Sequence, residues 1–60
     1  MPGEQRVAVL VLWCGDHYEA RIAGGWYSGR DYPTDGTYKA RRAARGKAIR
    51  RALKSLEREL

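Results

Sequence analysis

Residues 18–30 read YEARIAGGWYSGR and predict a β-hairpin. In residues 18–22 apolar and polar side chains alternate, as they do in a strand with one buried face. The pair Gly24-Gly25 follows, and two consecutive glycines favour a two-residue turn because primed turns need positive φ at both central positions. We therefore expect residues 26–30 to return as the next strand, with Ala23 opposite Trp26.

The stretch before this hairpin, VAVLVLW at residues 7–13, predicts a first strand because it is β-branched, aromatic and short. If residues 14–17 form a four-residue loop, Trp13 pairs with Tyr18 and Val9 with Ile22. Side chains alternate across a sheet, so one face becomes the expected core. That face carries Val7, Val9, Val11, Trp13, Tyr18, Ala20, Ile22 and Tyr27. The other face is less polar than a solvated face should be, since it carries Leu10, Leu12 and Trp26.

The remainder of the chain predicts one long helix. Thr34, Asp35 and Thr37 are each suited to cap its start, and from there to the C-terminus only Gly46 interrupts good helix formers. After Gly46 an apolar stripe recurs at helical spacing and is expected to pack on the sheet. It consists of Ile49, Ala52, Leu53, Leu56 and Leu60. Before Gly46 charges point most ways round, so we expect that part to project past the core. Gly46 itself predicts a kink or a close backbone approach.

Length and composition indicate one α+β domain, residues 6–60, a three-stranded antiparallel meander followed by a basic amphipathic helix, after a flexible terminus of residues 1–5. Domains this small bury only about 60% of their unfolded surface and often need a staple or a partner copy. Cys14 is the only cysteine and His17 the only histidine, so we expect no disulfide, metal or cofactor. A homodimer is therefore expected, with Leu10, Leu12 and Trp26 as its interface. A single cysteine is typical of proteins of the reducing cytoplasm, so we expect this location. The apolar runs are too short to cross a membrane as a helix.

Positive charge is concentrated in the predicted helix. The chain carries a net charge of +5, and from Tyr38 onward its Lys and Arg residues meet only Glu57 and Glu59. Such a basic element is typical of proteins that bind polyanions. The densest part lies within two turns of the helix start, where free N–H groups also favour phosphate. It comprises Lys39, Arg41, Arg42 and Arg45. A merely solvated, soluble helix is the other interpretation.

Catalytic chemistry has little support in this sequence. Nucleophilic catalysis needs a nucleophile, a base and an orienting group, and only Cys14, Asp16 and His17 lie close enough to be considered. A partly buried thiol and a loop histidine explain the same residues, and the glycines match no phosphate-binding loop. We therefore expect a protein that is not an enzyme.

From Gly15 onward the chain resembles the C-terminal part of a double-stranded-RNA-binding domain. The resemblance rests on a Gly-x-His loop, a Gly-Gly hairpin, a Tyr-x-Gly strand and a basic helix with an Ala-Arg-x-Ala-Ala pattern. Here these are Gly15-Asp16-His17, Gly24-Gly25, Tyr27-Ser28-Gly29, and residues 40–44 followed by Ala48-Ile49. The resemblance implies that His17 enters a minor groove, that Lys39 and Arg41 meet phosphates, and that Arg42 and Arg45 support them.

Two features depart from that family. Its first helix has no counterpart, because only six residues precede the first predicted strand, and its paired lysines fall on Thr37 and Tyr38. The missing helix would expose core surface, which a second copy would cover. Trp26 is also suited to stacking on unpaired bases, since Arg21 and Arg30 flank it, although we expect it to be an interface residue.

The function predicted from the sequence is non-enzymatic nucleic-acid binding through phosphates, with double-stranded RNA ahead of DNA on the strength of the resemblance. The alternative is a protein-interaction module, antitoxin-like or phage-inhibitor-like, whose basic helix docks on an acidic protein partner.

Overall fold

Three short strands are followed by one long helix, which confirms the expected α+β fold. The computed structural model describes residues 7–59, and side chains to residue 58. Its elements in chain order are β1 (Val9–Trp13), β2 (Tyr18–Ile22), a single 3₁₀ turn η1 (Ala23–Gly25), β3 (Tyr27–Asp31) and α1 (Tyr38–Glu59). The expected flexible terminus, residues 1–5, and the expected helix residue Leu60 lie outside the described residues.

The strands form one antiparallel sheet in the order β1-β2-β3. Trp13 lies opposite Tyr18 and Val9 opposite Ile22, which confirms the register predicted from a four-residue first loop. On the other side of β2, Ile22 lies opposite Tyr27. The first strand begins at Val9 rather than at Val7.

The second hairpin loop is longer than predicted. Gly24 and Gly25 have φ values of 68° and 100°, as the primed turn requires, but Ala23 is also left-handed at φ 55°. Trp26 is helical, with φ −59° and ψ −35°. Because three consecutive left-handed residues bend the chain away from an extended path, Ala23 and Trp26 leave the strands. Four residues therefore connect Ile22 to Tyr27, and β3 begins one residue later than expected.

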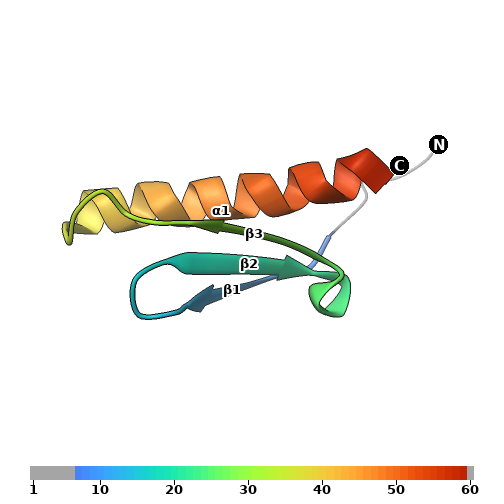
Figure 1. Ribbon diagram of the computed structural model, residues 1–60, viewed down its shortest axis with the longest axis horizontal. Helices are drawn as coiled ribbons and strands as arrows, with labels where there is room; N and C mark the ends of the chain where they lie inside the picture. The colour runs from blue at the N-terminus through green and yellow to red at the C-terminus, as the bar shows by residue number, and fades with distance from the viewer. Residues whose placement is uncertain (1–6, 60) are drawn as a thin grey trace.

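Helix α1 lies along β3 and β2 and scarcely touches β1, the strand farthest from it (Figure 1). Its closest approach is to Gly29 of β3. A Cβ placed on Gly29 would lie 2.4 Å from the backbone nitrogen of Ala52 and 2.6 Å from the carbonyl oxygen of Ala48. We call Gly29, Ala48 and Ala52 the glycine–alanine seam. The missing Gly29 side chain lets the helix backbone rest directly on β3.

The core is centred on this seam, and it is narrower than predicted. Ala20, Ile22, Ala48 and Ala52 form its buried cluster, while the expected larger residues of the helix stripe pack only partly buried around it. These are Ile49, Leu53 and Leu56. Val7 and Trp13, both predicted in the core, remain 40% and 42% exposed because the helix scarcely touches β1.

The first turns of α1 extend past the core cluster, as expected (Figure 1): residues 38–43 are exposed apart from half-buried Ala40, and no helix residue before Ala48 belongs to that cluster. They still contact other parts of the chain. Ala44 is only 2% exposed, and the Arg41 guanidinium lies 5.2 Å from the ring centre of Trp13. The helix runs without interruption through Gly46, where a Cβ would meet nothing closer than an Arg50 side-chain nitrogen at 4.0 Å. The close backbone approach expected at Gly46 occurs at Gly29 instead.

Thr37 caps the helix. Its hydroxyl oxygen accepts a hydrogen bond from the Ala40 N–H at 3.2 Å, which satisfies one of the free donors of the first turn. The Asp35 carboxylate in turn accepts bonds from the Thr37 hydroxyl at 2.6 Å and the Thr37 N–H at 2.8 Å. These bonds, the hydroxyl first, lower the pKa of Asp35 below its usual value of 3.8.

Candidate nucleic-acid interface

Three arginines converge at the start of α1. Arg41, Arg42 and Arg45 line a hollow of about 500 Å³ together with Tyr38 from the first helical turn and Tyr18 from β2. We call these five residues the arginine hollow. The helix brings its members together because residues three and four apart share one side of a helix. The hollow opens on the side of α1 that faces β2 and the end of β1, since Tyr18 lines it and Arg41 contacts Trp13.

The arginines of the hollow have no carboxylate partner among residues 7–58. The ion pairs of that part of the chain join Asp16 to His17, Glu19 to Arg21 and Asp31 to Arg51. Arg41 instead contacts the face of Trp13, whose ring centre lies 4.8 Å from that of Tyr18. An arginine over an aromatic face is held in place while its positive charge stays available. The hollow is therefore positively charged, and one of its cations is positioned in advance.

The structure places Lys39 apart from the three arginines. Lys39 borders a separate, smaller depression, whose other lining residues include Asp35 and Thr37. A carboxylate thus lies on the same side of the helix start as Lys39, whereas the arginine hollow is lined by none. Of the four cations that are close in sequence, Lys39 therefore borders a different depression from the three arginines.

His17 is also separate from the arginine hollow. Its Nδ1 lies 2.5 Å from a carboxylate oxygen of Asp16, and its ring packs against Tyr32 at an interplanar angle of 35°, with 4.8 Å between ring centres. The side chain is only 16% exposed, so most of the ring is covered. The loop of residues 14–17 nevertheless lies at the same end of the molecule as the start of α1 (Figure 1).

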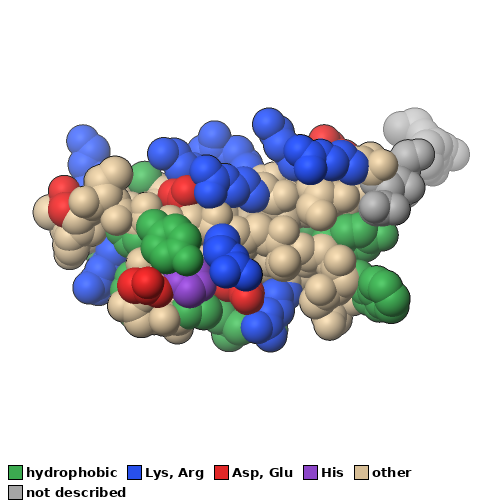
Figure 2. Space-filling view, in the orientation of Figure 1, with side chains coloured by type: hydrophobic (Ala, Val, Ile, Leu, Met, Phe, Trp, Pro, Cys, Tyr) green, Lys and Arg blue, Asp and Glu red, His purple; other side chains and the backbone are tan. Residues whose placement is uncertain are grey.

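A second basic group, which the sequence analysis did not single out, lies farther along the helix. Lys47, Arg50, Arg51 and Lys54 border a shallow depression of about 180 Å³. Arg51 is engaged, since its Nη1 lies 2.8 Å from a carboxylate oxygen of Asp31 and donates to the Arg30 carbonyl at 2.7 Å. In the sequence, the spacing of these basic residues by three and four positions was the signal that they share one side of the helix. Basic side chains consequently gather along much of α1 (Figure 2).

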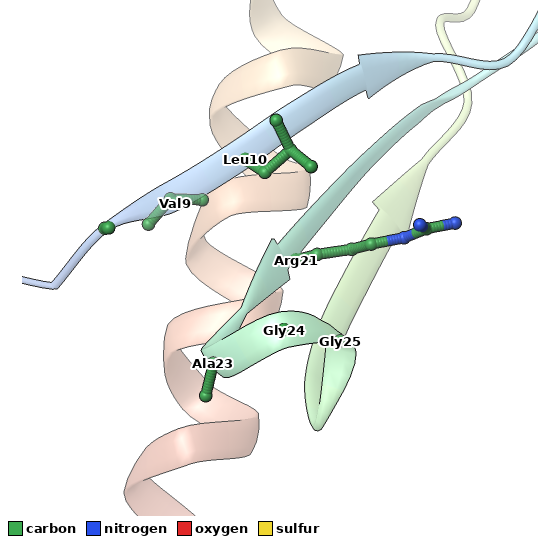
Figure 3. Close-up of a pocket in the computed structure, with 7 residues that line it drawn as sticks. Val9, Leu10, Arg21, Ala23, Gly24 and Gly25 are labelled. Carbon is green, nitrogen blue, oxygen red and sulfur yellow. The ribbon is translucent and has the colours of Figure 1, made fainter.

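The three expected interface residues do not form one surface. Leu10, 57% exposed, and Arg21 project from the sheet face turned away from α1, beside a hollow that continues to the η1 turn (Figure 3). Leu12 is half-buried. Trp26 is 86% exposed in the loop and does not line that hollow. Because Trp26 is not part of β3, it does not follow the alternation of side chains that predicted it on the same face as Leu10 and Leu12.

The sequence candidates for catalysis are also placed by the structure. Cys14 is exposed, and its backbone N–H donates to the His17 carbonyl at 2.8 Å. Among the described residues no group of three His, Cys, Asp or Glu side chains is arranged to hold a metal ion. Within the same residues, no helix combines the length and apolarity that crossing a membrane requires.

Comparison with known proteins gives no match for this chain among family models, curated proteins or solved structures.

Proposed function

We propose that this protein binds nucleic acid without catalysis, and that the arginine hollow contacts the phosphates. The observation that carries the proposal is the convergence of Arg41, Arg42 and Arg45 on one hollow without a carboxylate among its lining residues. Arg41 and Arg45 lie four residues apart, and like charges at that spacing destabilise a helix by a few tenths of a kcal/mol, about the size of one ion pair. A bound polyanion would remove that repulsion.

Arginine also suits the proposed ligand chemically. Its planar guanidinium presents several N–H donors in a fork that matches two oxygens of one phosphate, and it stays protonated at any physiological pH. Three such forks within two helical turns, beside the N-terminal end of α1, make phosphate the favoured anion.

Duplex RNA is the first target to test. The resemblance implies one contact from the His17 loop and another from the helix start, and both segments lie at the same end of the molecule (Figure 1). In this proposal Lys39 and His17 are outlying contacts on either side of the arginine hollow. His17 would have to leave Tyr32 to reach a groove, which makes the arginines the principal contact.

The experiment measures affinity for duplex RNA, duplex DNA and single strands by fluorescence anisotropy over a range of salt concentrations. Each phosphate contact contributes a log–log slope of about −0.9 on B-form duplex. Replacing Arg41, Arg42 and Arg45 together by Ala is expected to flatten the slope by about two to three units.

The matched control replaces Lys47, Arg50 and Lys54 by Ala, which removes the same charge from the second basic group. This control is expected to lose much less affinity and to keep most of the slope. Equal losses in both triple variants would show that net charge, not the hollow, governs binding. If no nucleic acid binds even at low salt, the proposal is wrong and the acidic protein partner becomes the interpretation to pursue.

A further inference from the structure

Aromatic rings accompany the cations of the arginine hollow. Tyr38 is 79% exposed although it lies in the first turn of α1, and Tyr18 forms the opposite wall from β2. Trp13, beside Tyr18, is 42% exposed and lies under Arg41. Three aromatic side chains therefore lie in or beside a hollow whose cations alone would suffice for phosphate.

The fold does not account for the exposure of Tyr38. The core cluster and the residues packed around it do not include Tyr38, and none of the hydrogen bonds that cap the helix involves its side chain. An exposed aromatic ring next to guanidinium groups offers what a nucleobase binds: a flat apolar face, with cations nearby for the adjoining phosphate. The hollow, at about 500 Å³, also has room for more than a phosphate group.

We propose that the arginine hollow accommodates one unpaired nucleotide of the bound nucleic acid. The phosphate lies on Arg42 and Arg45, and the base stacks on the exposed ring of Tyr38, with Arg41 held over Trp13 at the other side. Tyr38, Arg42 and Arg45 are spaced by four and three residues, so one side of α1 presents the ring and both guanidinium groups. Bases within a duplex are stacked on their neighbours, so the nucleotide comes from an overhang, a bulge or a single strand.

This inference rests on the proposed function, and the experiment separates the two. Three RNA probes are compared at one low salt concentration: a blunt duplex, the same duplex with a short single-stranded overhang, and the same overhang made abasic. The abasic probe keeps every phosphate and removes only the stacking faces. We expect the intact overhang to bind about tenfold more tightly than the blunt duplex, and the abasic overhang to lose most of that gain.

Variants then assign the effect to Tyr38. Tyr38→Leu is expected to abolish the preference for the intact overhang, and Tyr38→Phe to retain it, since the ring remains. Trp26→Leu is the comparison variant: Trp26, 86% exposed and outside the hollow, is the other ring suited to base stacking, and we expect its replacement to leave the overhang preference unchanged. Circular dichroism checks that each variant keeps its helix.

Two results would overturn the inference in different ways. Equal affinity for the intact and abasic overhangs would eliminate base stacking while leaving phosphate binding by the hollow in place. Absence of binding to all three probes would instead eliminate the proposed function, and the inference with it.

Discussion

Helix α1 packs closely on one edge of the sheet and leaves the other edge uncovered. On the β3 side the helix backbone rests on Gly29, close enough that a Cβ would lie 2.4 Å from a helix nitrogen. On the β1 side the helix scarcely touches the sheet, and Val7 and Trp13 remain 40% and 42% exposed. Because α1 lies close to β3, it does not cover β1.

This difference explains where the arginine hollow comes from. Alanines and a glycine at the seam hold α1 down on β3, so the wide side chains of its first turns extend beside the ends of β1 and β2. At the covered edge, small residues let the helix lie close to β3. At the start of α1, beside the open edge, positively charged side chains predominate. The two edges should therefore respond to different kinds of substitution.

The largest effect is expected from filling the seam. Gly29→Ala places a methyl group against backbone atoms of α1, and overpacking of this kind costs about 3 kcal/mol, at the upper end of the usual range. Domains of this size rarely have more than about 3–5 kcal/mol of stability, so the variant should be largely unfolded. Thermal and urea unfolding followed by circular dichroism measure the change.

The matched control makes the same substitution at Gly46. A Cβ there meets only the far end of Arg50, at 4.0 Å, and Ala is a better helix former than Gly by about 1 kcal/mol. Gly46→Ala should therefore stabilise the protein while Gly29→Ala destabilises it. A Gly29→Ala variant as stable as the wild type would contradict the assignment of the close contact to Gly29.

The next effect concerns the open edge, where the sequence predicts a homodimer. Sedimentation equilibrium at micromolar concentration should give twice the monomer mass, and Leu12→Lys should weaken association about tenfold or more, because a lysine buried at an interface lacks a partner. Thr34→Lys, on an exposed residue of the turn before α1, should leave association unchanged. A wild-type chain that sediments only as a monomer would contradict the prediction.

The smallest effect is expected at the turn that joins β3 to α1. Hydrogen bonds from Thr37 lower the pKa of Asp35, so the ionised carboxylate stabilises the fold above its usual pKa of 3.8. That contribution disappears as the pH falls through the lower folded-state value. Asp35→Asn should therefore lower the melting temperature slightly near neutral pH, and the difference should shrink as the pH falls through the lowered pKa of Asp35. A difference that persisted in acid would contradict this account.

The strand register could be predicted because it depends on local turns. The Cys14–His17 loop and the Gly24-Gly25 pair each determine their partners within a few residues, and the pairs Val9–Ile22 and Ile22–Tyr27 agree with the prediction. The predicted pair Ala23–Trp26 does not form, because both residues belong to the loop. The role of Gly29 could not be predicted in this way, since a close approach depends on a helix about twenty residues away. A spaced set of alanines on that helix, Ala40, Ala44, Ala48 and Ala52, was the signal that it packs closely.

The candidate site was predicted in part for the same reason. Spacing correctly grouped Arg41, Arg42 and Arg45, because helical periodicity is local. Lys39 was grouped with them by proximity in sequence, but it borders a separate depression that Asp35 also lines. The contributions of Tyr18 and Trp13 come from strands and required the three-dimensional arrangement.

The contact at Gly29 has a consequence for how this protein can evolve. The atoms that a Gly29 side chain would strike belong mainly to the backbone of α1, a nitrogen and a carbonyl oxygen, and every amino acid at positions 48 and 52 would supply that oxygen and nitrogen. No second substitution on the helix can therefore restore the lost space, as a smaller side chain would in an ordinary core. A selection for suppressors of Gly29→Ala should return true revertants, or stabilising changes elsewhere in the chain, rather than compensating residues in the contact.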